Sequence, residues 1–546
     1  MYVRLKTSKQ SKNSTLQIVE GVREGKKVKQ RIVASLGVVA DQNNLKKLLK
    51  LAESLTRKIE EQGLPVSPKV DLSKLFHTMT IYDGFGMVVN NLMELTGFSK
   101  ILQAAQGKNQ FNLEEAVKLI LTQRLDLPSS KLRTYERQQE HGFNEIDLQH
   151  LYRAMDVLEP FSDKIQAQAF KAARSNANYP VDCFFFDVTT LYFESVKQDE
   201  LRDFGFSKDQ KHHSVQVVLA LVVDREGIPL AYETFKGNLA ETKTLIPVLE
   251  QLRSRFSVEN VTVVCDRGLA SETNVNALQV AKFHFVIATK LRSIAKKHNI
   301  NDISKYIPLP NQTNIPEAER TLFHTLEHPQ YKDTLLIATY SPSRAAKDKQ
   351  DRERLLKKLQ DKITDLPNET SVKKVISNSG YKKYTTIKTG SSIALNQAAI
   401  DADAAWDGFH GIAVSNSAKL TTTEALARYR DLWHVEETFR IAKSTLKTRP
   451  IFHWVPHRIR AHILLCFMTL FIERLLELLL RQKGTSLTPE KIRHALSKVH
   501  TMHFKELDTK RQGKMESSLN EDAEKIFAVL GISADRKVGI SNQCCA

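Results

Sequence analysis

The run Cys183–Phe193 constrains the fold more than any other feature of the sequence, because it is too apolar to form the edge of a sheet. One residue in it, Asp187, is a carboxylic acid among hydrophobic neighbours. Burying a carboxylate is costly unless a cation, a proton or hydrogen-bond donors compensate it. We therefore expect an inner strand whose acid has a partner.

The segments that follow this run alternate between strand and helix patterns. We predict strands at Val215–Val223, Ile228–Phe235, Val261–Asp266 and Phe283–Ala288, and helices at Glu241–Phe256 and Ser271–Ala281. The complete order is β-β-β-α-β-α-β. Three meandering strands followed by α/β crossovers are the layout of the ribonuclease-H-like fold, so the sequence predicts an α/β core with a mixed sheet of this type.

A long segment interrupts this core before a helical stretch that begins near Tyr429. Residues 267 to 428, which are 162 residues, separate that stretch from Asp266, and one helix and one strand use roughly 22 of them. The remainder is too long for a loop. It contains strand-like runs and a charged helix at Ser343–Thr364. We interpret it as an inserted, mainly β subdomain.

The regions outside the core have patterns of their own. The chain begins with two strand-like pieces and a helical stretch, and a helical period dominates from residue 75 onward. The predicted domains are a basic β-hairpin and helix at 1–70, a helical module at 71–175, the first part of the core at 176–290, the insertion at 291–425, the completion of the core at 426–482, and a helical C-terminal region with a polar tail at 483–546.

Charge is the outlier in an otherwise ordinary composition. The chain carries 80 Lys and Arg against 62 Asp and Glu, a net charge of +18. Such a balance favours a polyanionic partner, nucleic acid before an anionic membrane surface. The longest apolar stretch, Ile463–Ile472, is too short to span a bilayer. The few cysteines, none in a Cys-x-x-Cys pair, fit a reducing compartment, so we expect a cytoplasmic protein.

One helix-length segment near the end of the core has an unusual polar stripe. Tyr429, Glu436 and Lys443 are spaced seven and seven apart, which returns a helix to nearly the same azimuth, and Trp433 lies beside Glu436 at i−3. A buried amphipathic helix does not need a phenol, a carboxylate and an ammonium in one line. A site that holds a metal ion and a DNA phosphate does.

Three acids are candidates for a metal site. Asp187 lies within one predicted strand, Asp266 ends another, and Glu436 completes a plausible ring of oxygen ligands of the kind that Mg²⁺ prefers. Two such ions can activate a hydroxyl nucleophile and stabilise the leaving oxygen at phosphorus. Each acid alone also fits a structural role, as a cap, a turn residue or a solvated helix residue. Asp182 and Glu437 are the rival acids to the first and the third.

In these motifs the chain resembles the DDE transposases of bacterial insertion sequences. One branch of that family has a helix that reads Tyr, two spacers, Arg, three spacers, Glu, six spacers, Lys, and Tyr429, Glu436 and Lys443 fall on this frame. Asp266-Arg267-Gly268 and Phe186-Asp187-Val188-Thr189 resemble the motifs of the second and first aspartates. A β-rich insertion before the Glu helix is also typical of the branch. The likeness covers about residues 180 to 480 and is weaker in the N-terminal region.

The resemblance implies a function and a set of roles. Asp187, Asp266 and Glu436 would bind two Mg²⁺ or Mn²⁺ ions, and water and then the freed 3′-hydroxyl would attack DNA. The partners would be double-stranded DNA, at the element ends and at the target, and a second copy of the chain. The 1–175 region would recognise the ends, and the apolar segment Ile459–Leu480 either forms the dimer surface or packs on the core.

The DNA contacts implied by the resemblance come from both the core and the insertion. They are Tyr429, Trp433, Arg440, Lys443, Arg267 and Trp406. Trp433 either packs the helix or stacks on a base, and Trp406 either supports a displaced base or belongs to the core of the insertion.

One position departs from the family frame. Leu432 stands where the frame has its Arg, which in the family helps to hold a DNA phosphate, and Arg428, Arg430 or Arg440 could substitute. Two other functions remain open. One is a transposase remnant that binds DNA without cutting it, and the other is a different ribonuclease-H-like nuclease, such as a junction resolvase.

Overall fold

The computed structural model describes the residues 1–7, 14–24, 27–39, 41–62, 75–206, 213–256, 261–295, 298–310, 312, 314–364, 379–388, 392–506, 512–534 and 538–541. The chain divides into two compact units. The first comprises Met1–Phe85, Gln139–Gly142 and His494–Ala546, and the second comprises Gly86–Gln138 and Phe143–Arg493. A membrane-crossing helix, long and apolar throughout, is not found among the described residues.

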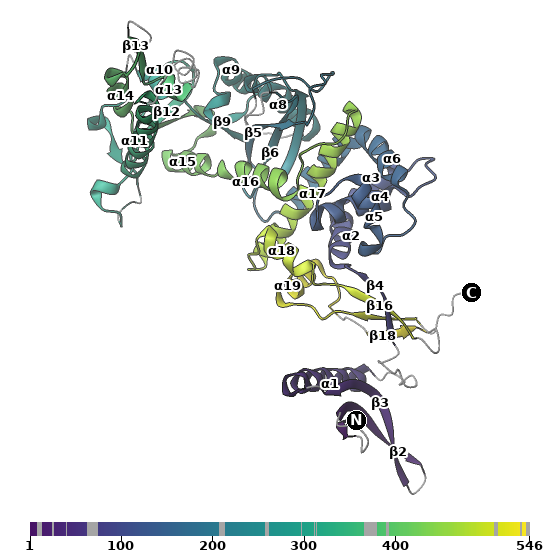
Figure 1. Ribbon diagram of the computed structural model, residues 1–546. Helices are drawn as coiled ribbons and strands as arrows, with labels where there is room; N and C mark the ends of the chain where they lie inside the picture. Colours follow the sequence, from purple (N-terminus) through teal and green to yellow (C-terminus); the bar gives the residue numbers. More distant parts are fainter. Residues whose placement is uncertain are drawn as a thin grey trace. The chain divides into compact units, whose positions relative to one another are not determined.

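The second unit contains the predicted core (Figure 1). Its strands are β5 (Cys183–Tyr192), β6 (Gln216–Val223), β7 (Pro229–Lys236), β8 (Thr262–Cys265) and β9 (His284–Ala288), and its helices are η4 (Glu241–Lys243), α8 (Leu245–Phe256), η5 (Arg267–Leu269) and α9 (Glu272–Val280). The strands lie in the order β7-β6-β5-β8-β9. The three meandering strands are antiparallel, whereas β8 is parallel to β5 and β9 is parallel to β8. This is the ribonuclease-H-like arrangement, and it confirms the predicted fold class.

Burial explains why β5 and β6 lie inside the sheet. Every residue of β6 is buried, and β5 is buried except at Asp187 and Tyr192. Strands that read as nearly continuous apolar runs are stable only when both faces are covered. The helices begin where the sequence offers caps, and the Ser271 side chain accepts a hydrogen bond from the Asn274 backbone N–H at the start of α9.

The insertion continues the sheet of the core. Its elements are α10 (Leu291–Ala295), η6 (Ile303–Lys305), β10 (Ile307–Pro308), η7 (Glu317–Glu319), β11 (Leu322–Glu327), β12 (Thr334–Tyr340), α11 (Pro342–Thr364), α13 (Ser379–Lys382), β13 (Thr385–Lys388), β14 (Ser392–Leu395), α14 (Gln397–Ala404), β15 (Phe409–Ser415) and η8 (Asn416–Ala418). Strand β15 pairs with β9 and with β12, so that the order β10-β11-β12-β15 extends the same sheet. The predicted strands are accompanied by helices, of which α11 is the charged helix expected from the sequence.

Helices that precede the core in the sequence and helices that follow it complete the second unit. They are α2 (Gly84–Thr96), α3 (Phe98–Ala105), α4 (Leu113–Asp126), α5 (Lys131–Glu136), α6 (Leu148–Leu158), η3 (Glu159–Phe161), α7 (Ser162–Asn176), α15 (Thr422–Arg430), α16 (Trp433–Arg440), η9 (Ile441–Thr445) and α17 (Pro456–Gln482). The short helix η2 (Gln138–His141) belongs to the first unit from Gln139 on. Helix α17 packs against α4, α6, α7 and β7. Its apolar residues are buried within this chain, which excludes the reading of this helix as an exposed dimer surface.

The N-terminal helices therefore differ from the prediction of a separate helical module. From Gly86 onward they belong to the same compact unit as the sheet, because α17 provides a long apolar face for them. The prediction is also wrong at its start, since β4 (Leu75–Ile81) is a strand.

The first unit contains two further sheets. Strands β1 (Tyr2–Thr7), β2 (Ser14–Glu24) and β3 (Lys27–Val39) form an antiparallel sheet, and α1 (Gln42–Gln62) packs on it through a small apolar core. Strands β2 and β3 and helix α1 lie where the hairpin and helix are predicted, and β1 adds a strand that the sequence analysis does not predict. The other sheet has the order β18-β17-β16-β4, with β16 (Thr501–Glu506), β17 (Gln512–Glu516) and β18 (Val538–Ser541), and α19 (Glu521–Leu530) belongs to the same unit. In sequence, α18 (Pro489–Leu496) runs from the second unit into the first.

The second of these sheets corrects the prediction of a helical C-terminal region. Strand β16 pairs with β4, which precedes it by more than 400 residues. Pairing over such a distance leaves no local periodic signal, so the sequence alone predicts a polar tail where these strands lie. The predicted domain boundary near residue 70 lies outside the described residues.

Candidate active site

Two of the three predicted acids lie side by side because of strand register. Strands β5 and β8 pair in parallel up to Phe186 and Cys265, and the next residue on each is an aspartate, Asp187 and Asp266. Asp187 is half-buried and accepts a hydrogen bond from the Val188 backbone N–H at 2.7 Å. Asp266 is exposed where β8 ends. The carboxyl ends of adjacent parallel strands therefore present two carboxylates at one edge of the sheet.

The charges of these aspartates affect the pKa values of neighbouring groups. Burial raises the pKa of the Cys265 thiol, and the negative charges of Asp266 and Asp187 raise it further. Burial likewise raises the pKa of Tyr429, with Asp266 as the next cause. Two neighbouring carboxylates repel each other unless a cation or a proton lies between them.

The predicted signature helix is not a single helix, which corrects the one-stripe interpretation. Helix α15 ends at Arg430, α16 begins at Trp433, and η9, which contains Lys443, is a π-helical turn. The backbone N–H groups of Leu432 and Val435 donate to carbonyls three residues earlier, at 3.2 Å in both cases. Tighter i→i+3 turns and wider π turns rotate the chain by other angles than the 100° of an α-helix, so the seven-residue spacing does not keep one azimuth.

The residues of that segment consequently face different surroundings. Tyr429 lies against the His410 ring, with centroids 5.0 Å apart, and lines the same pocket as Asp266. Glu436 is exposed in the first turn of α16, and Lys443 is half-buried in η9. Trp433 is 48% exposed and stacks on His434 with centroids 3.8 Å apart, so it does not pack the helix onto the core.

The structure brings Asp187 and Asp266 together but does not assemble all three acids. Helix α16 packs against β5 and β6, which places Glu436 on a helix that neighbours the aspartate strand. Within the described ranges no group of three or more His, Cys, Asp or Glu side chains is arranged to hold a metal ion. The donor set consists of carboxylate oxygens, which suit Mg²⁺ or Mn²⁺ in chemistry.

Residues of the core and of the insertion together line a pocket of about 950 Å³. From the core it is lined by Asp266, Arg267 and Tyr429, and from the insertion by residues that include Trp406 and His410. Trp406 is half-buried and packs edge-on against Phe409, at 5.8 Å between centroids. It thus belongs to the apolar core of the insertion and also reaches the pocket.

Sequence reasoning missed the polar groups that line this pocket. Arg292, Lys383 and Tyr384 all donate to the buried Asp403, and Arg352 donates to Asp407 at 2.6 Å. Burial alone would raise the pKa of Asp403, but these donors lower it to about 2. The partners are up to 111 residues apart in sequence, and only the position of the two aspartates around Trp406 could have drawn attention to them.

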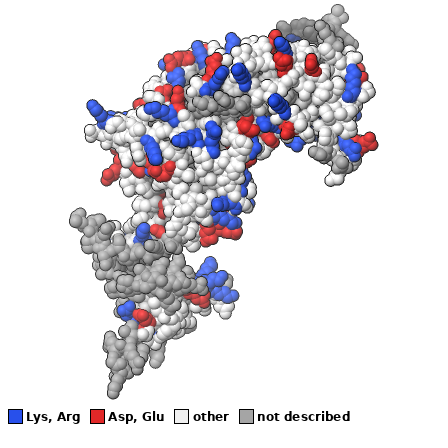
Figure 2. Space-filling model, turned by 180° about the vertical axis from the view of Figure 1, so that it is seen from behind, with Lys and Arg blue, Asp and Glu red and all other residues white. Residues whose placement is uncertain are grey.

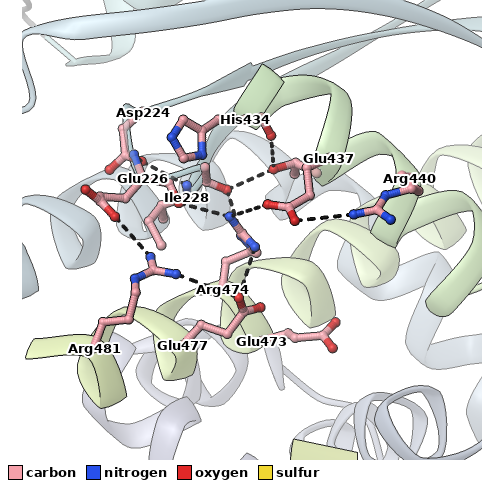
Figure 3. A network of polar contacts seen from close by, with 12 residues as sticks. Asp224, Glu226, Ile228, His434, Glu437, Arg440, Glu473, Arg474, Glu477 and Arg481 are labelled. Carbon is pink, nitrogen blue, oxygen red and sulfur yellow. Dashed lines mark hydrogen bonds and ion pairs between the residues drawn. The ribbon is translucent and has the colours of Figure 1, made fainter. Parts of the chain in front are cut away.

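Two rival acids have structural partners instead. Asp182 forms an ion pair with Arg428 at 3.3 Å, and its backbone carbonyl accepts the N–H of Thr262. Glu437 forms ion pairs with Arg440 at 3.3 Å and with the buried Arg474 at 3.4 Å (Figure 3). Sequence reasoning missed Arg474, because it lies in the middle of an apolar helix.

The basic charge of the chain is dispersed on the face that Figure 2 shows. Lys and Arg side chains are interspersed there with Asp and Glu side chains and do not form one broad basic patch. Electrostatic attraction to a polyanion on this face therefore comes from many separate cations.

Comparisons with known proteins agree with the motifs. The family model "Transposase DDE domain" matches residues 180–472, and "IS1634 family transposase, N-terminal domain" matches residues 3–65. Among solved structures, a piggyBac transposase synaptic complex with hairpin DNA is similar at 10% identity over 77% of this chain and 80% of that chain, with a TM-score of 0.33. A Mos1 transposase paired-end complex with the left transposon end is similar at 11% identity over 43% and 66%, with a TM-score of 0.15.

A search of curated proteins finds no match. The match to the DDE domain covers more than half of the chain, includes both candidate aspartates and Glu436, and falls on the ribonuclease-H-like core described above. The chain therefore belongs to the DDE transposase family of bacterial insertion sequences and is a DNA transposase.

Proposed function

We propose that Asp187, Asp266 and Glu436 are the catalytic residues with which this transposase cuts DNA at the ends of its element and joins the freed 3′-hydroxyl ends to target DNA. The observation that carries the proposal is the parallel register of β5 and β8, which puts the first two acids on neighbouring strand ends. Glu436 follows from the family frame and from the packing of α16 against β5.

The three carboxylates would hold two Mg²⁺ or Mn²⁺ ions. Bound ions supply a more acidic attacking hydroxyl and a stabilised leaving oxygen at phosphorus. Within the described residues the three acids are not grouped to hold a metal, so the Glu436 side chain would turn toward the aspartates when the site is loaded. The strands would fix Asp187 and Asp266, and Glu436 would adjust by side-chain rotation while α16 stays in place.

The remaining residues would bind DNA around the cut. Tyr429, Arg267 and Trp406 line one pocket with Asp266, so a DNA strand in that pocket would run next to a catalytic acid. Trp433 and Arg440 are exposed on the same helix as Glu436, and Lys443 follows in η9. These positions suit contacts to phosphates and, for the tryptophans, stacking on bases.

The absent motif arginine has one substitute that the contacts favour. Leu432 is buried, Arg428 is paired with Asp182, and Arg440 is paired with Glu437. Arg430 is exposed and lines a second cavity together with Tyr429. We therefore assign the phosphate contact of the missing arginine to Arg430.

We further propose that a homodimer pairs two element ends on DNA. The apolar face of α17 is covered within one chain, so the dimer contact has to lie elsewhere. The N-terminal region would recognise the ends, in keeping with the family match to residues 3–65.

The test is Mg²⁺-dependent cleavage of a labelled duplex that carries the element's own end, with wild type compared with Glu436→Gln. We expect cleavage by the wild type alone and equal affinity of both proteins for the duplex. Glu521→Gln, which changes an exposed pair on α19 by the same substitution, serves as a control for general effects of substitution. Binding without cleavage by either protein in Mg²⁺ and in Mn²⁺ would contradict the proposal and favour a DNA-binding remnant.

A further inference from the structure

A buried arginine lies at the centre of a polar network beneath α16. The Arg474 side chain projects from the middle of α17 and is 3% exposed. Its Nε donates to the Gly227 carbonyl at 3.2 Å, its Nη2 donates to the Glu226 carbonyl at 3.0 Å, and its Nη1 donates to Glu477 at 3.0 Å. Figure 3 shows this guanidinium between Glu437 and Glu477. One side chain thus connects α17, the turn after β6 and α16.

The contact to α16 is made through the residue next to the candidate catalytic acid. Nη2 of Arg474 lies 3.4 Å from Oε2 of Glu437, whose other oxygen accepts from Arg440 at 3.3 Å. Thr438 also contacts the turn: its buried hydroxyl lies 2.7 Å from the His434 carbonyl of α16 and 3.1 Å from the Gly227 carbonyl, so its single proton is shared between the two. Neighbouring residues on a helix point about 100° apart, so fixing residues 437 and 438 also fixes the direction of Glu436.

The turn that receives these contacts has room for them only because it contains a glycine. Gly227 has a φ of +77°, which favours glycine, and a Cβ there would lie 2.4 Å from Nη2 of Arg474. Asp224 holds the turn by accepting the backbone N–H groups of Glu226 at 2.9 Å and Ile228 at 2.8 Å. Asp224 thus fixes the shape of the turn that Arg474 and Thr438 contact.

We infer that Arg474 and Glu437 are positioning residues, which hold α16 so that Glu436 faces the two aspartates when the site is loaded. This inference rests on the proposed catalytic role of Glu436. It also assigns the adjacent acids opposite tasks: Glu436 acts on the reacting groups, whereas Glu437 anchors the helix.

The first test compares Glu437→Gln with Glu477→Gln. Each removes one carboxylate charge from Arg474, but only the first contact belongs to α16. We expect Glu437→Gln to lower the single-turnover rate of end cleavage by roughly 10- to 100-fold, the loss typical of misplaced reacting groups, at unchanged affinity for end DNA. The single-turnover cleavage rate of Glu477→Gln should stay within about threefold of the wild-type rate.

A second readout follows the helix itself. In a background with Trp406→Phe and Trp454→Phe, Trp433 is the remaining tryptophan, and it lies one turn before Glu437 on α16. We expect Glu437→Gln and Arg474→Lys to change the iodide quenching of Trp433 fluorescence in the protein without DNA or metal. Arg474→Lys keeps the charge but loses the planar fork of donors, so its cleavage rate should also fall.

The outcomes separate this inference from the catalytic proposal. Wild-type cleavage and quenching in Glu437→Gln, or an equal slowing by Glu477→Gln, would overturn the positioning role and leave the role of Glu436 intact. An active Glu436→Gln protein beside a fully inactive Glu437→Gln protein would instead make Glu437 the catalytic acid and overturn both.

Discussion

The two sides of the candidate site are built in different ways. The aspartates occupy neighbouring strand ends, and backbone pairing between β5 and β8 sets their separation. The glutamate lies on a short helix whose orientation depends on side chains, above all on Arg474, Glu437 and Thr438. The strand side should therefore tolerate changes of its neighbours, whereas the helix side should respond to substitutions far from the chemistry.

The largest effect is expected from the strand side itself. Asp187→Asn or Asp266→Asn should lower end cleavage by roughly 10³-fold or more, since loss of a metal-binding carboxylate removes several kcal/mol of transition-state stabilisation. The thermal unfolding midpoint should not fall, because each change removes repulsion between two adjacent carboxylates. Cleavage rates and a melting curve for each protein would check both statements. If the Asp187→Asn protein still cleaved DNA, Asp187 would not be a catalytic residue, and the contrast between the strand side and the helix side would no longer hold.

On the helix side, Gly227→Ala should have the greatest effect on stability. The new Cβ would meet Arg474 at 2.4 Å and would occupy a backbone conformation with a φ of +77°. We expect a loss of about 2–4 kcal/mol in the free energy of unfolding, together with slower cleavage. Denaturant unfolding measures the first and single-turnover kinetics the second. Gly484→Ala, with a φ of +76° but open space around it, is the matched control for backbone strain.

The buried Lys131, which lies near the segment that follows η9, predicts that the stability of the protein depends on pH. Burial, with Arg124 as the next cause, lowers the pKa of Lys131 to about 7, and Arg124 holds the Leu446 carbonyl in the chain that leaves η9. The folded state then binds fewer protons than the unfolded state between pH 7 and 10.5, so stability should rise with pH across this window.

The rise should amount to about 2 kcal/mol between pH 7 and pH 9. Lys131→Met should remove this rise and should stabilise the protein at neutral pH. Unfolding by denaturant at a series of pH values would show it. An unchanged pH profile in Lys131→Met would mean that this lysine is not the titrating group.

The smallest of these effects is expected for Thr438→Val. The substitution keeps the shape of the side chain and removes a buried hydroxyl whose proton is shared between the His434 and Gly227 carbonyls, while the ion pair of Glu437 remains. A cost of about 1–2 kcal/mol in unfolding free energy and a slight slowing of cleavage should result. If this variant cleaved as slowly as Glu437→Gln, the hydroxyl rather than the ion pair would hold the helix.

The strand side was largely predictable from the sequence, because its signals are local. The apolar runs around Asp187 and Asp266 identified the strands, and the alternation of elements identified the fold. The roles of the two acids remain a prediction from the motifs. That the two acids lie on neighbouring strand ends follows from the parallel pairing of β5 and β8 that the fold class implies.

The helix side was not predictable in the same way. The break at Asp431 and Leu432 replaces α-helical bonds by i→i+3 bonds, and no Pro or Gly marks it in the sequence. The partner of Glu437 lies 37 residues later, at Arg474, inside a helix read only as apolar. Continuity of the sheet into the insertion also escaped prediction, because β9 and β15 are distant in sequence.

That continuity has a consequence for how the gene product can be shortened. Strand β9 is apolar and buried, and β15 covers its outer edge over Val286–Ala288. A version of the chain without the insertion would end its sheet in a bare hydrophobic edge, which invites strand-to-strand association between molecules. The insertion thus covers a hydrophobic sheet edge in addition to lining the pocket.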